Sequence, residues 1–267
     1  MADNVFTKRN FGRPSEWEVA GLRWLGEVTQ AGGARVVKVH DADAQTGIQL
    51  QRVRTTAPTR AAAERFGQQL ARTHAAGAPA FGSGPMASDA QPWQGDGYQG
   101  PNESLLSLPL QPHDSWGAFY SSVIIHPLAE RAVSVGSLSS NDATLITELC
   151  DRLEAGEFDD GTPPARVHGD LWSGNVLWDD DGAILIDPCA HGGHGFADIA
   201  ALGIFGAPHL DAIIGAYADE RGLTTQQPDW QRSLCLHRLH LLLLHVAIFG
   251  GSYSAQTMGD VRAALAL

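Results

Sequence analysis

The stretch that most constrains this chain is a loop followed by a short hairpin, between residues 168 and 188. The loop, residues 168–175, reads HGDLWSGN, and two short apolar runs, 176–178 and 183–186, come after it. An Asp-Gly turn between two β-prone runs is a strong hairpin signal. Such a hairpin folds Asp187, which follows its second strand, back towards the loop. The pattern therefore predicts that Asp170, Asn175 and Asp187 converge in one small volume.

Three oxygen-bearing side chains in this arrangement fit phosphoryl transfer. One carboxylate orients the attacking hydroxyl and accepts its proton, while an amide oxygen and a second carboxylate hold Mg²⁺ on the phosphates. Asp170 precedes Asn175 by five positions, the interval between the base and the metal-binding amide in the kinase catalytic loop. We predict Asp170 as the catalytic base and Asn175 and Asp187 as metal ligands. The alternative is an ordinary turn rich in Asp, Gly and Asn.

The complete octet, with its Leu-Trp-Ser-Gly centre, resembles the signature of the fructosamine kinase (ketosamine-3-kinase) family, relatives of the aminoglycoside phosphotransferases. The resemblance implies an α+β, bilobal, protein-kinase-like fold. Residues 1–56 would form a small, shortened, β-rich nucleotide-binding lobe, and residues 57–267 a larger, mainly helical lobe. It also implies ATP and Mg²⁺ as cofactors and a ketosamine acceptor, such as a fructosyl- or ribulosyl-amine, phosphorylated at its 3-hydroxyl. Another hydroxylated or aminoglycoside-like metabolite is the alternative acceptor.

The first 53 residues supply candidates for the nucleotide side. Residues 5–8 alternate like a strand that ends in Lys8, and the expected helix after it, with Ser15 as its N-cap, carries Glu18. They resemble the kinase lysine that contacts the phosphates and the helix glutamate that orients it. The null hypothesis is two solvated surface charges. In the family's order Gln51 and Val53 fall in the adenine-side connector, where an acidic residue is common.

Only seven residues precede Lys8, which leaves no room for the glycine-rich turn and the two strands that usually cover the nucleotide. Three explanations are open: a mis-set start, a shortened lobe, or a non-catalytic relative. Because the candidate base, metal ligands and Lys8/Glu18 are all retained, we disfavour a degenerate enzyme.

Further site candidates come from the resemblance. Trp172 and His168 are candidates for substrate contact, and Asp198 resembles the carboxylate that accepts backbone N–H groups of the catalytic loop. Two departures stand out: aliphatic residues at 123–124, where the family tends to carry arginines, and Gly-Phe at 195–196, where it usually has a polar, acidic pair.

Residues 78–113 lack a periodic apolar pattern, and a loop of that length is usually functional or mobile. We expect it to border the acceptor cleft, with Trp93, Tyr98 and Asn102 as sugar contacts; loosely ordered surface is the alternative. Apolar periodicity predicts strands at 34–39 and 47–53. It predicts helices at 59–74, 116–123 (interrupted at Pro127), 141–154, 210–221, 230–249 and 256–267.

Composition narrows the partners. A net charge of -12 argues against a nucleic-acid surface, which needs clustered Lys and Arg. Three widely spaced cysteines without Cys-x-x-Cys indicate reduced thiols in a cytoplasm, and no secretory signal precedes Lys8. The apolar run 239–249 is too short for a membrane span and predicts a buried helix. The expected partner is therefore a small-molecule or glycated-amine substrate, with the oligomeric state left open.

Two other function classes compete with the kinase hypothesis. One is a nucleotide-binding pseudokinase or regulatory module, which would bind Mg-ATP without turnover. The other is a metal-dependent hydrolase built on His191, His194 and Asp187, or on a second set on one helix: His237, His240 and His245. We disfavour the hydrolase because the first set is loop-like and the second lies in an apolar segment, where packed neutral histidines are common.

Overall fold

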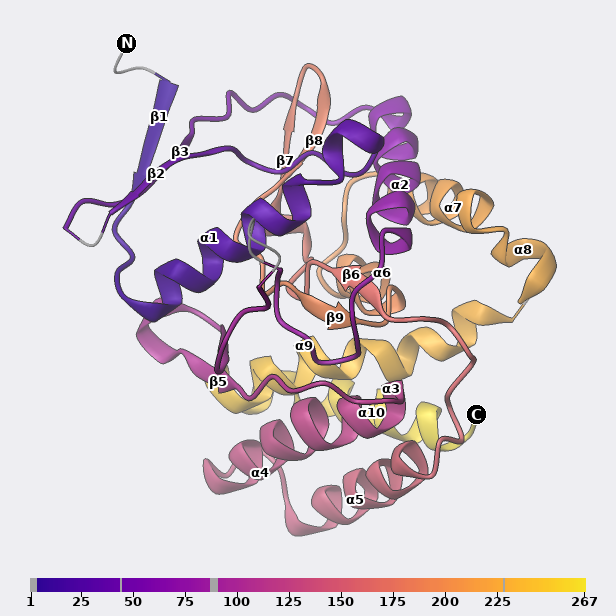
Figure 1. Cartoon of the computed structure of the whole chain (residues 1–267). Helices are drawn as coiled ribbons and strands as arrows, with labels where there is room; N and C mark the ends of the chain where they lie inside the picture. Colours follow the sequence, from indigo (N-terminus) through magenta and orange to yellow (C-terminus); the bar gives the residue numbers. More distant parts are fainter. Residues whose placement is uncertain (1–3, 44, 87–90, 228) are drawn as a thin grey trace.

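The computed structural model describes residues 4–43, 45–86, 91–227 and 229–267 and places them in a small sheet lobe and a larger helical lobe (Figure 1). The strands are β1 Val5–Lys8, β2 Val39–Asp43, β3 Gly47–Gln51, β4 Gly97–Gln99, β5 Leu106–Leu108, β6 Ala165–Val167, β7 Val176–Asp179, β8 Gly182–Leu185 and β9 His191–Gly193. The helices are α1 Arg13–Gly26, α2 Arg60–Ala75, α3 Trp116–Phe119, α4 His126–Ser134, α5 Ser140–Glu154, α6 Phe196–Ile204, α7 Leu210–Arg221, α8 Leu223–Gln226, α9 Leu234–Phe249 and α10 Ser254–Leu265. The predicted fold class is confirmed, whereas the division near residue 56 stays a prediction.

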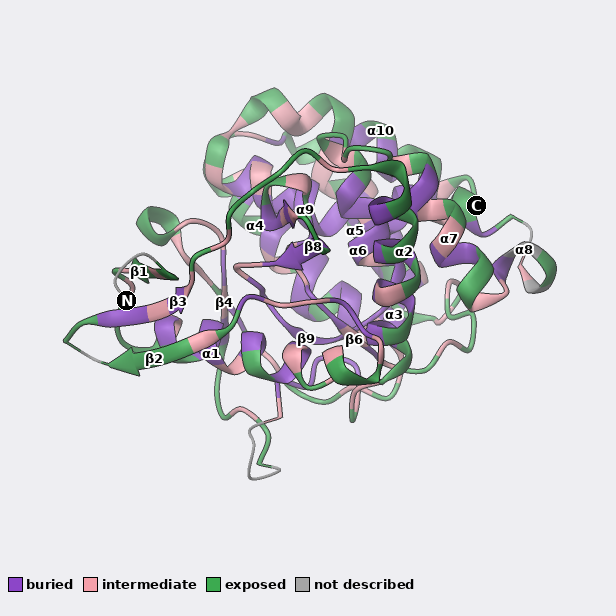
Figure 2. Ribbon diagram, turned by 90° about the horizontal axis from the view of Figure 1, so that it is seen from above, coloured by how far each residue is buried: buried purple, intermediate pink, exposed green. Residues whose placement is uncertain are grey.

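The small lobe is a three-stranded antiparallel sheet in the order β1-β3-β2, with α1 packed against it. Figure 2 shows that β2 is largely exposed, whereas much of β3 is buried. The strand expected at 34–39 begins only at Val39. Before it, the Val37 N–H donates to the Leu185 carbonyl at 2.9 Å, and the Leu185 N–H donates to Arg35. This stretch therefore ties the small lobe to the hairpin that carries Asp187.

Helix α1 begins earlier than its sequence suggested. Gly12 adopts φ 69° at the N-cap, Pro14 occupies the first turn, and the Ser15 N–H already bonds to the Gly12 carbonyl at 3.0 Å. Ser15 is therefore inside the helix, and its prediction as N-cap was wrong. Proline is favoured in the first turn because its fixed φ suits a helix and its missing N–H has no partner there.

The large lobe is built around α9, which packs against α4, α6 and α10 (Figure 1). Leu239, Leu242 and Leu243 are fully buried, and each such side chain contributes about 1.5–3 kcal/mol to folding. Trp230–Phe249 is long and apolar enough to cross a membrane, yet 61% of that window is buried inside the protein. Burial on this scale is typical of a core helix, as predicted.

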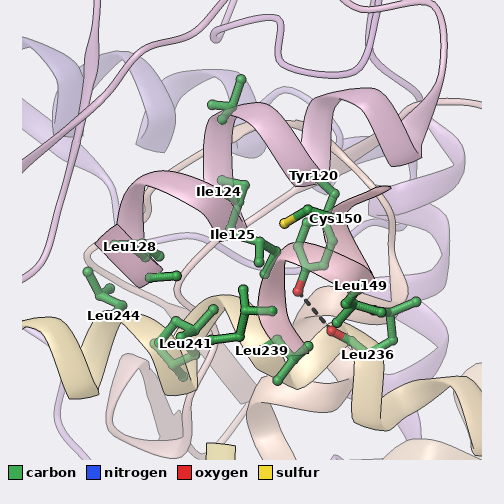
Figure 3. Packing of buried hydrophobic residues seen from close by; sticks show 14 of the residues in the cluster. Tyr120, Ile124, Ile125, Leu128, Leu149, Cys150, Leu236, Leu239, Leu241 and Leu244 are labelled. Atoms are coloured by element: carbon green, nitrogen blue, oxygen red, sulfur yellow. Dashed lines mark hydrogen bonds between the residues drawn. The ribbon is translucent and has the colours of Figure 1, made fainter. Parts of the chain in front are cut away.

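Residues 116–134 form one continuous helical path rather than two segments interrupted at Pro127. A π-helical stretch, Tyr120–Ile125, joins α3 to α4, and Pro127 lies in the first turn of α4. The Tyr120 side chain reaches into α9, where its hydroxyl donates to the Leu236 carbonyl at 2.9 Å (Figure 3). The interruption was wrongly predicted because a proline is tolerated where a new helical turn begins.

The segment 78–113 is not structureless where it is described. Strands β4 and β5 pair antiparallel in it, with Gly97 opposite Leu108 and Gln99 opposite Leu106. The pattern missed them because each strand has only three residues, too few to show alternation.

Candidate active site

The loop and hairpin fold as the sequence predicted. β7 and β8 pair antiparallel with Val176 opposite Leu185, and the Ile186 N–H donates to the Asn175 carbonyl at 3.1 Å. This pairing carries the chain back to the catalytic loop, so that Asp187 lies beside Asn175. Asp187 itself adopts a left-handed φ of 53°, which is uncommon for a residue other than glycine.

The two loop candidates, Asp170 and Asn175, are in direct contact. The Asn175 side-chain nitrogen donates to the Asp170 carbonyl at 2.8 Å and to Asp170 Oδ2 at 3.0 Å. Because the amide nitrogen is used in this way, the Asn175 carboxamide oxygen remains for a cation. Burial raises the pKa of Asp170 to about 7, against the lowering effect of the Asn175 hydrogen bond. A carboxyl group with that pKa is suited to exchanging a proton near neutral pH.

Asp198, at the start of α6, holds the catalytic loop from beneath. Its two carboxylate oxygens accept the backbone N–H groups of His168 at 2.7 Å and Gly169 at 3.0 Å. His74 Nε2 lies 3.0 Å from Asp198 Oδ2, and the other ring nitrogen lies 2.9 Å from the Tyr217 hydroxyl. Burial opposes ionisation, but the His74 hydrogen bond and charge keep the pKa of Asp198 below its ordinary value.

Gly169 is required at the turn between β6 and Asp170. Its φ is +81°, and a Cβ built there would overlap the carbonyl oxygen of Cys189. The two backbone segments are also hydrogen-bonded, because the Cys189 N–H donates to the His168 carbonyl at 2.8 Å. The loop is thus fixed on one side by α6 and on the other by the residues that follow Asp187.

Lys8 joins the small lobe to this loop system. Its ammonium lies 2.8 Å from Glu18 Oε2 and 2.9 Å from Asp187 Oδ1. Burial alone would lower the pKa of Lys8, but the charges of Glu18 and Asp187 outweigh it and raise that pKa. Burial raises the pKa of Glu18, against the opposing charge of Lys8. The two residues are therefore a partly buried ion pair, not the separate surface charges of the null hypothesis.

These side chains line one cleft of about 380 Å³ between the lobes. Trp172 is 36% exposed at its edge, with its ring 5.7 Å from that of Phe205. Tyr98 and Asn102 also line the cleft, as expected for the 78–113 segment. Trp93 does not line it; its ring packs against that of Trp17, with the ring centroids 5.4 Å apart. The cleft is lined by Lys8, Asn10, Pro14, Trp17, Glu18, Tyr98, Gln99, Gly100, Pro101, Asn102, Leu105, Asp170, Trp172, Asn175, Asp187, Pro188, Cys189, Leu241, Leu244, His245, Ile248 and Phe249.

Three predicted contact residues lie outside this lining. His168 is fully buried below the loop, where its Nε2 bonds to the Ile186 carbonyl at 2.9 Å, so its ring is not available to a substrate. Gln51 ends β3 opposite Val5, and Val53 packs against the apolar cluster under the sheet.

The two sequence departures also lie away from the cleft. Val123 and Ile124 are buried in the core of the large lobe on the π-helical stretch. A Cβ at Gly195 would meet the His74 ring and the Tyr217 hydroxyl, and Phe196 is buried. These positions shape packing and loop support, not the walls of the cleft.

The donor set around the loop suits Mg²⁺. The ion binds proteins through one or two carboxylates plus phosphate and water oxygens rather than through a full protein cage. Asp187 and the Asn175 carboxamide oxygen meet that requirement. In the described part of the chain no group of three or more His, Cys, Asp or Glu side chains is arranged to hold a metal ion. The histidine sets considered for a hydrolase therefore give no such centre among these residues.

Sequence reasoning missed Gln99 and the pairing of its side chain with His240. Gln99 lines the cleft from β4, and its Oε1 lies 2.9 Å from His240 Nε2 on α9. The residues are 141 positions apart, and no local pattern links them. The burial of Gln99 would have marked it as a candidate site residue, but that burial could be recognised only after β4 had been located.

A strand lysine, a helix glutamate and a loop that carries the candidate base, followed by its hairpin and arranged around an interlobe cleft, define a protein-kinase-like fold. The model of the fructosamine kinase family matches residues 5–266, and the chain belongs to that family.

Solved and curated relatives agree with this assignment. A structure described as "putative fructosamine-3-kinase", from Thermobifida fusca, is 39% identical, with a TM-score of 0.83 over 98% of this chain and 85% of that chain. A "probable ketoamine kinase" from Synechocystis sp. is 29% identical over 75% of this chain, which spans only 61% of that relative's length. The aminoglycoside phosphotransferase APH(4)-Ia, solved with ADP and hygromycin B, shares the fold alone, with 14% identity and a TM-score of 0.54 over 93% of this chain and 82% of its own.

Proposed function

We propose that this chain is an ATP- and Mg²⁺-dependent kinase that transfers the γ-phosphoryl group to a sugar hydroxyl, specifically the 3-hydroxyl of a ketosamine. Membership of the fructosamine kinase family supports the acceptor class. The single observation that carries the chemistry is the contact of Asp170 with Asn175 in the cleft that also contains Asp187 and Lys8.

Asp170 is the catalytic base in this proposal. Its carboxylate accepts the proton of the attacking hydroxyl, whose oxygen bonds to the γ-phosphorus while the bond to the β–γ bridging oxygen breaks and ADP leaves. The Asn175 side chain fixes the orientation of the Asp170 carboxylate through its bond to Oδ2. The pKa of about 7 keeps a large share of Asp170 ionised at neutral pH while leaving it basic enough to take a proton.

The remaining residues handle the nucleotide. Asp187 and the Asn175 oxygen hold Mg²⁺, which neutralises charge on the phosphates when it is bound. When the nucleotide binds, Lys8 gives up its contact with Asp187 and contacts a phosphate instead. Its ion pair with Glu18 is kept. We assign the adenine to the connector after β3, near Gln51 and Val53.

A coupled assay of ADP release over fructosamines, ribulosamines, simple sugars and aminoglycosides tests the proposal. The wild type is expected to turn over ketosamines, and Asp170→Asn to abolish turnover while retaining Mg-ATP binding. Asp181→Asn is the matched control, because that carboxylate lies exposed in the hairpin turn of the same motif. Mg-ATP binding by the wild type with no turnover of any acceptor would instead favour a nucleotide-binding module.

A further inference from the structure

Gln99 is an unusual residue to find in the wall of this cleft. It is the last residue of β4 and is only 5% exposed, although it borders the cleft. Glutamine is mostly exposed in proteins, and burial of its amide costs free energy unless its polar atoms are hydrogen-bonded. The hydrogen-bond partners of its Oε1 and Nε2 atoms therefore indicate the role of the side chain.

The Gln99 oxygen is already bound from behind. Oε1 lies 2.9 Å from Nε2 of His240, a buried residue in the middle of α9. Burial lowers the pKa of His240 to about 3, so the ring is neutral at physiological pH and carries one N–H. When that N–H is on Nε2 and donates to Oε1, the Gln99 amide nitrogen keeps both of its hydrogens for other acceptors.

His240 is itself held in a defined position. Its backbone N–H donates to the Tyr120 hydroxyl at 3.0 Å, and that hydroxyl donates to the Leu236 carbonyl at 2.9 Å. The hydroxyl thus contacts both the carbonyl and the N–H that are four residues apart in α9, and Figure 3 shows the contact with Leu236. The His240 ring is therefore presented to β4 from a rigid support.

A bound acceptor sugar would meet several hydrogen-bond acceptors in the cleft. Asp170, Asp187 and Glu18 are all carboxylates, which accept hydrogen bonds from hydroxyl groups when ionised. Lys8 is already engaged with two of these carboxylates. A sugar also presents oxygen lone pairs, and an amide N–H₂ is a donor that can satisfy them without adding charge.

We propose that Gln99 is an acceptor-binding residue whose side-chain N–H₂ donates to an oxygen of the sugar, and that His240 is the positioning residue that orients it. The inference rests on the proposed function, since it assigns the Gln99 wall to the sugar. A purely structural alternative is that the Gln99–His240 pair only joins β4 to α9.

Steady-state kinetics with four variants separate these roles. Gln99→Met removes the donor, and we expect KM for the ketosamine to rise about 10- to 100-fold, the range for an unmade buried hydrogen bond, while KM for ATP stays unchanged. Gln99→Glu, which places an acceptor atom there, is expected to be at least as severe. His240→Leu frees the Gln99 side chain and raises the same KM about fivefold or more. His240→Gln, which keeps a side-chain N–H, restores it to within about threefold of wild type.

Ser121→Ala is the control for loss of a buried hydrogen bond away from the cleft, since that hydroxyl bonds to Glu154 in the large lobe. It should lower the melting temperature and leave both KM values unchanged. If Gln99→Met and His240→Leu behave in the same way as Ser121→Ala, the pair is structural and the inference is wrong.

Titration calorimetry with a ketosamine in the absence of ATP distinguishes failure of the inference from failure of the proposed function. An inactive wild type that still binds the sugar, with binding weakened in Gln99→Met, would refute the kinase but retain the Gln99 assignment. An active wild type with unchanged sugar binding in Gln99→Met would support the kinase and refute the Gln99 assignment. Absence of both turnover and sugar binding would overturn both.

Discussion

Replacing the proposed base should make the protein more stable while making it inactive. Burial raises the pKa of Asp170 from an ordinary 3.8 to about 7, so the native state keeps a proton that the unfolded chain has already released. The stability contributed by protonated Asp170 is fully present below pH 3.8 and is lost as the pH rises through about 7. The asparagine side chain in Asp170→Asn is uncharged at every pH, so the variant does not lose this stability as the pH rises.

The magnitude follows from the interval between the two pKa values. At 1.36 kcal/mol per pKa unit, ionising Asp170 in the native state costs at most about 4 kcal/mol above pH 7. Between pH 5 and pH 8, the unfolding free energy of Asp170→Asn relative to wild type should therefore grow by about 2–3 kcal/mol. The gain reaches a plateau once native Asp170 is fully ionised.

Urea denaturation of both proteins at pH 5, 6, 7 and 8 measures this difference, with Asp181→Asn as the control for removing an exposed carboxylate. The control should show no comparable growth with pH. A difference between Asp170→Asn and wild type that stays flat, or shrinks as the pH rises, would refute the idea that Asp170 is ionised against a desolvation cost.

The remaining predictions address the rest of the site. The acceptor kcat/KM should fall as pH falls through about 7, because protonated Asp170 cannot accept a proton; a pH–rate profile checks this. Lys8→Met should weaken Mg-ATP binding about tenfold or more, measured by calorimetry, because a charge-assisted phosphate contact is lost. Asp198→Ala should destabilise the protein by about 3–5 kcal/mol in urea titrations, because buried loop N–H groups lose their partner. Gly169→Ala should cost more than Gly136→Ala in the same titrations: both glycines have positive φ, but only Gly169 has a carbonyl in the way of a Cβ.

The central part of the site could be predicted because its determinants are local in sequence. The Asp-Gly turn fixes the β7–β8 register within ten residues, and that register alone returns Asp187 to the side of Asn175. Glycine at 169 and the interval from Asp170 to Asn175 are likewise readable without any distant partner. The Lys8–Glu18 contact was accessible for a related reason, since a short strand and the next helix are consecutive in the chain.

Other parts depend on contacts that no local pattern encodes. The support of the loop by Asp198 was predicted only from the family resemblance, and its contact with His74, 124 positions away, was not predicted. The path through Pro127 was misread because the π-helical stretch before it arises from tertiary packing, in which Tyr120 reaches α9. Local propensity is a weak guide wherever such packing decides the backbone.

The segment 78–113, whose secondary structure was not predicted from the sequence, also connects α1 to the residues that follow Asp187. The carbonyl oxygen of Tyr98 accepts hydrogen bonds from Trp17 Nε1 at 3.1 Å and from Cys189 Sγ at 3.2 Å. Trp17 adjoins Glu18 in α1, and Cys189 follows Asp187 by two residues. One carbonyl of β4 therefore links the helix that orients Lys8 to the segment that positions Asp187. We therefore expect a shift of β4 to displace both carboxylates that contact the lysine, so that the proposed acceptor wall and the proposed phosphate-binding groups move together.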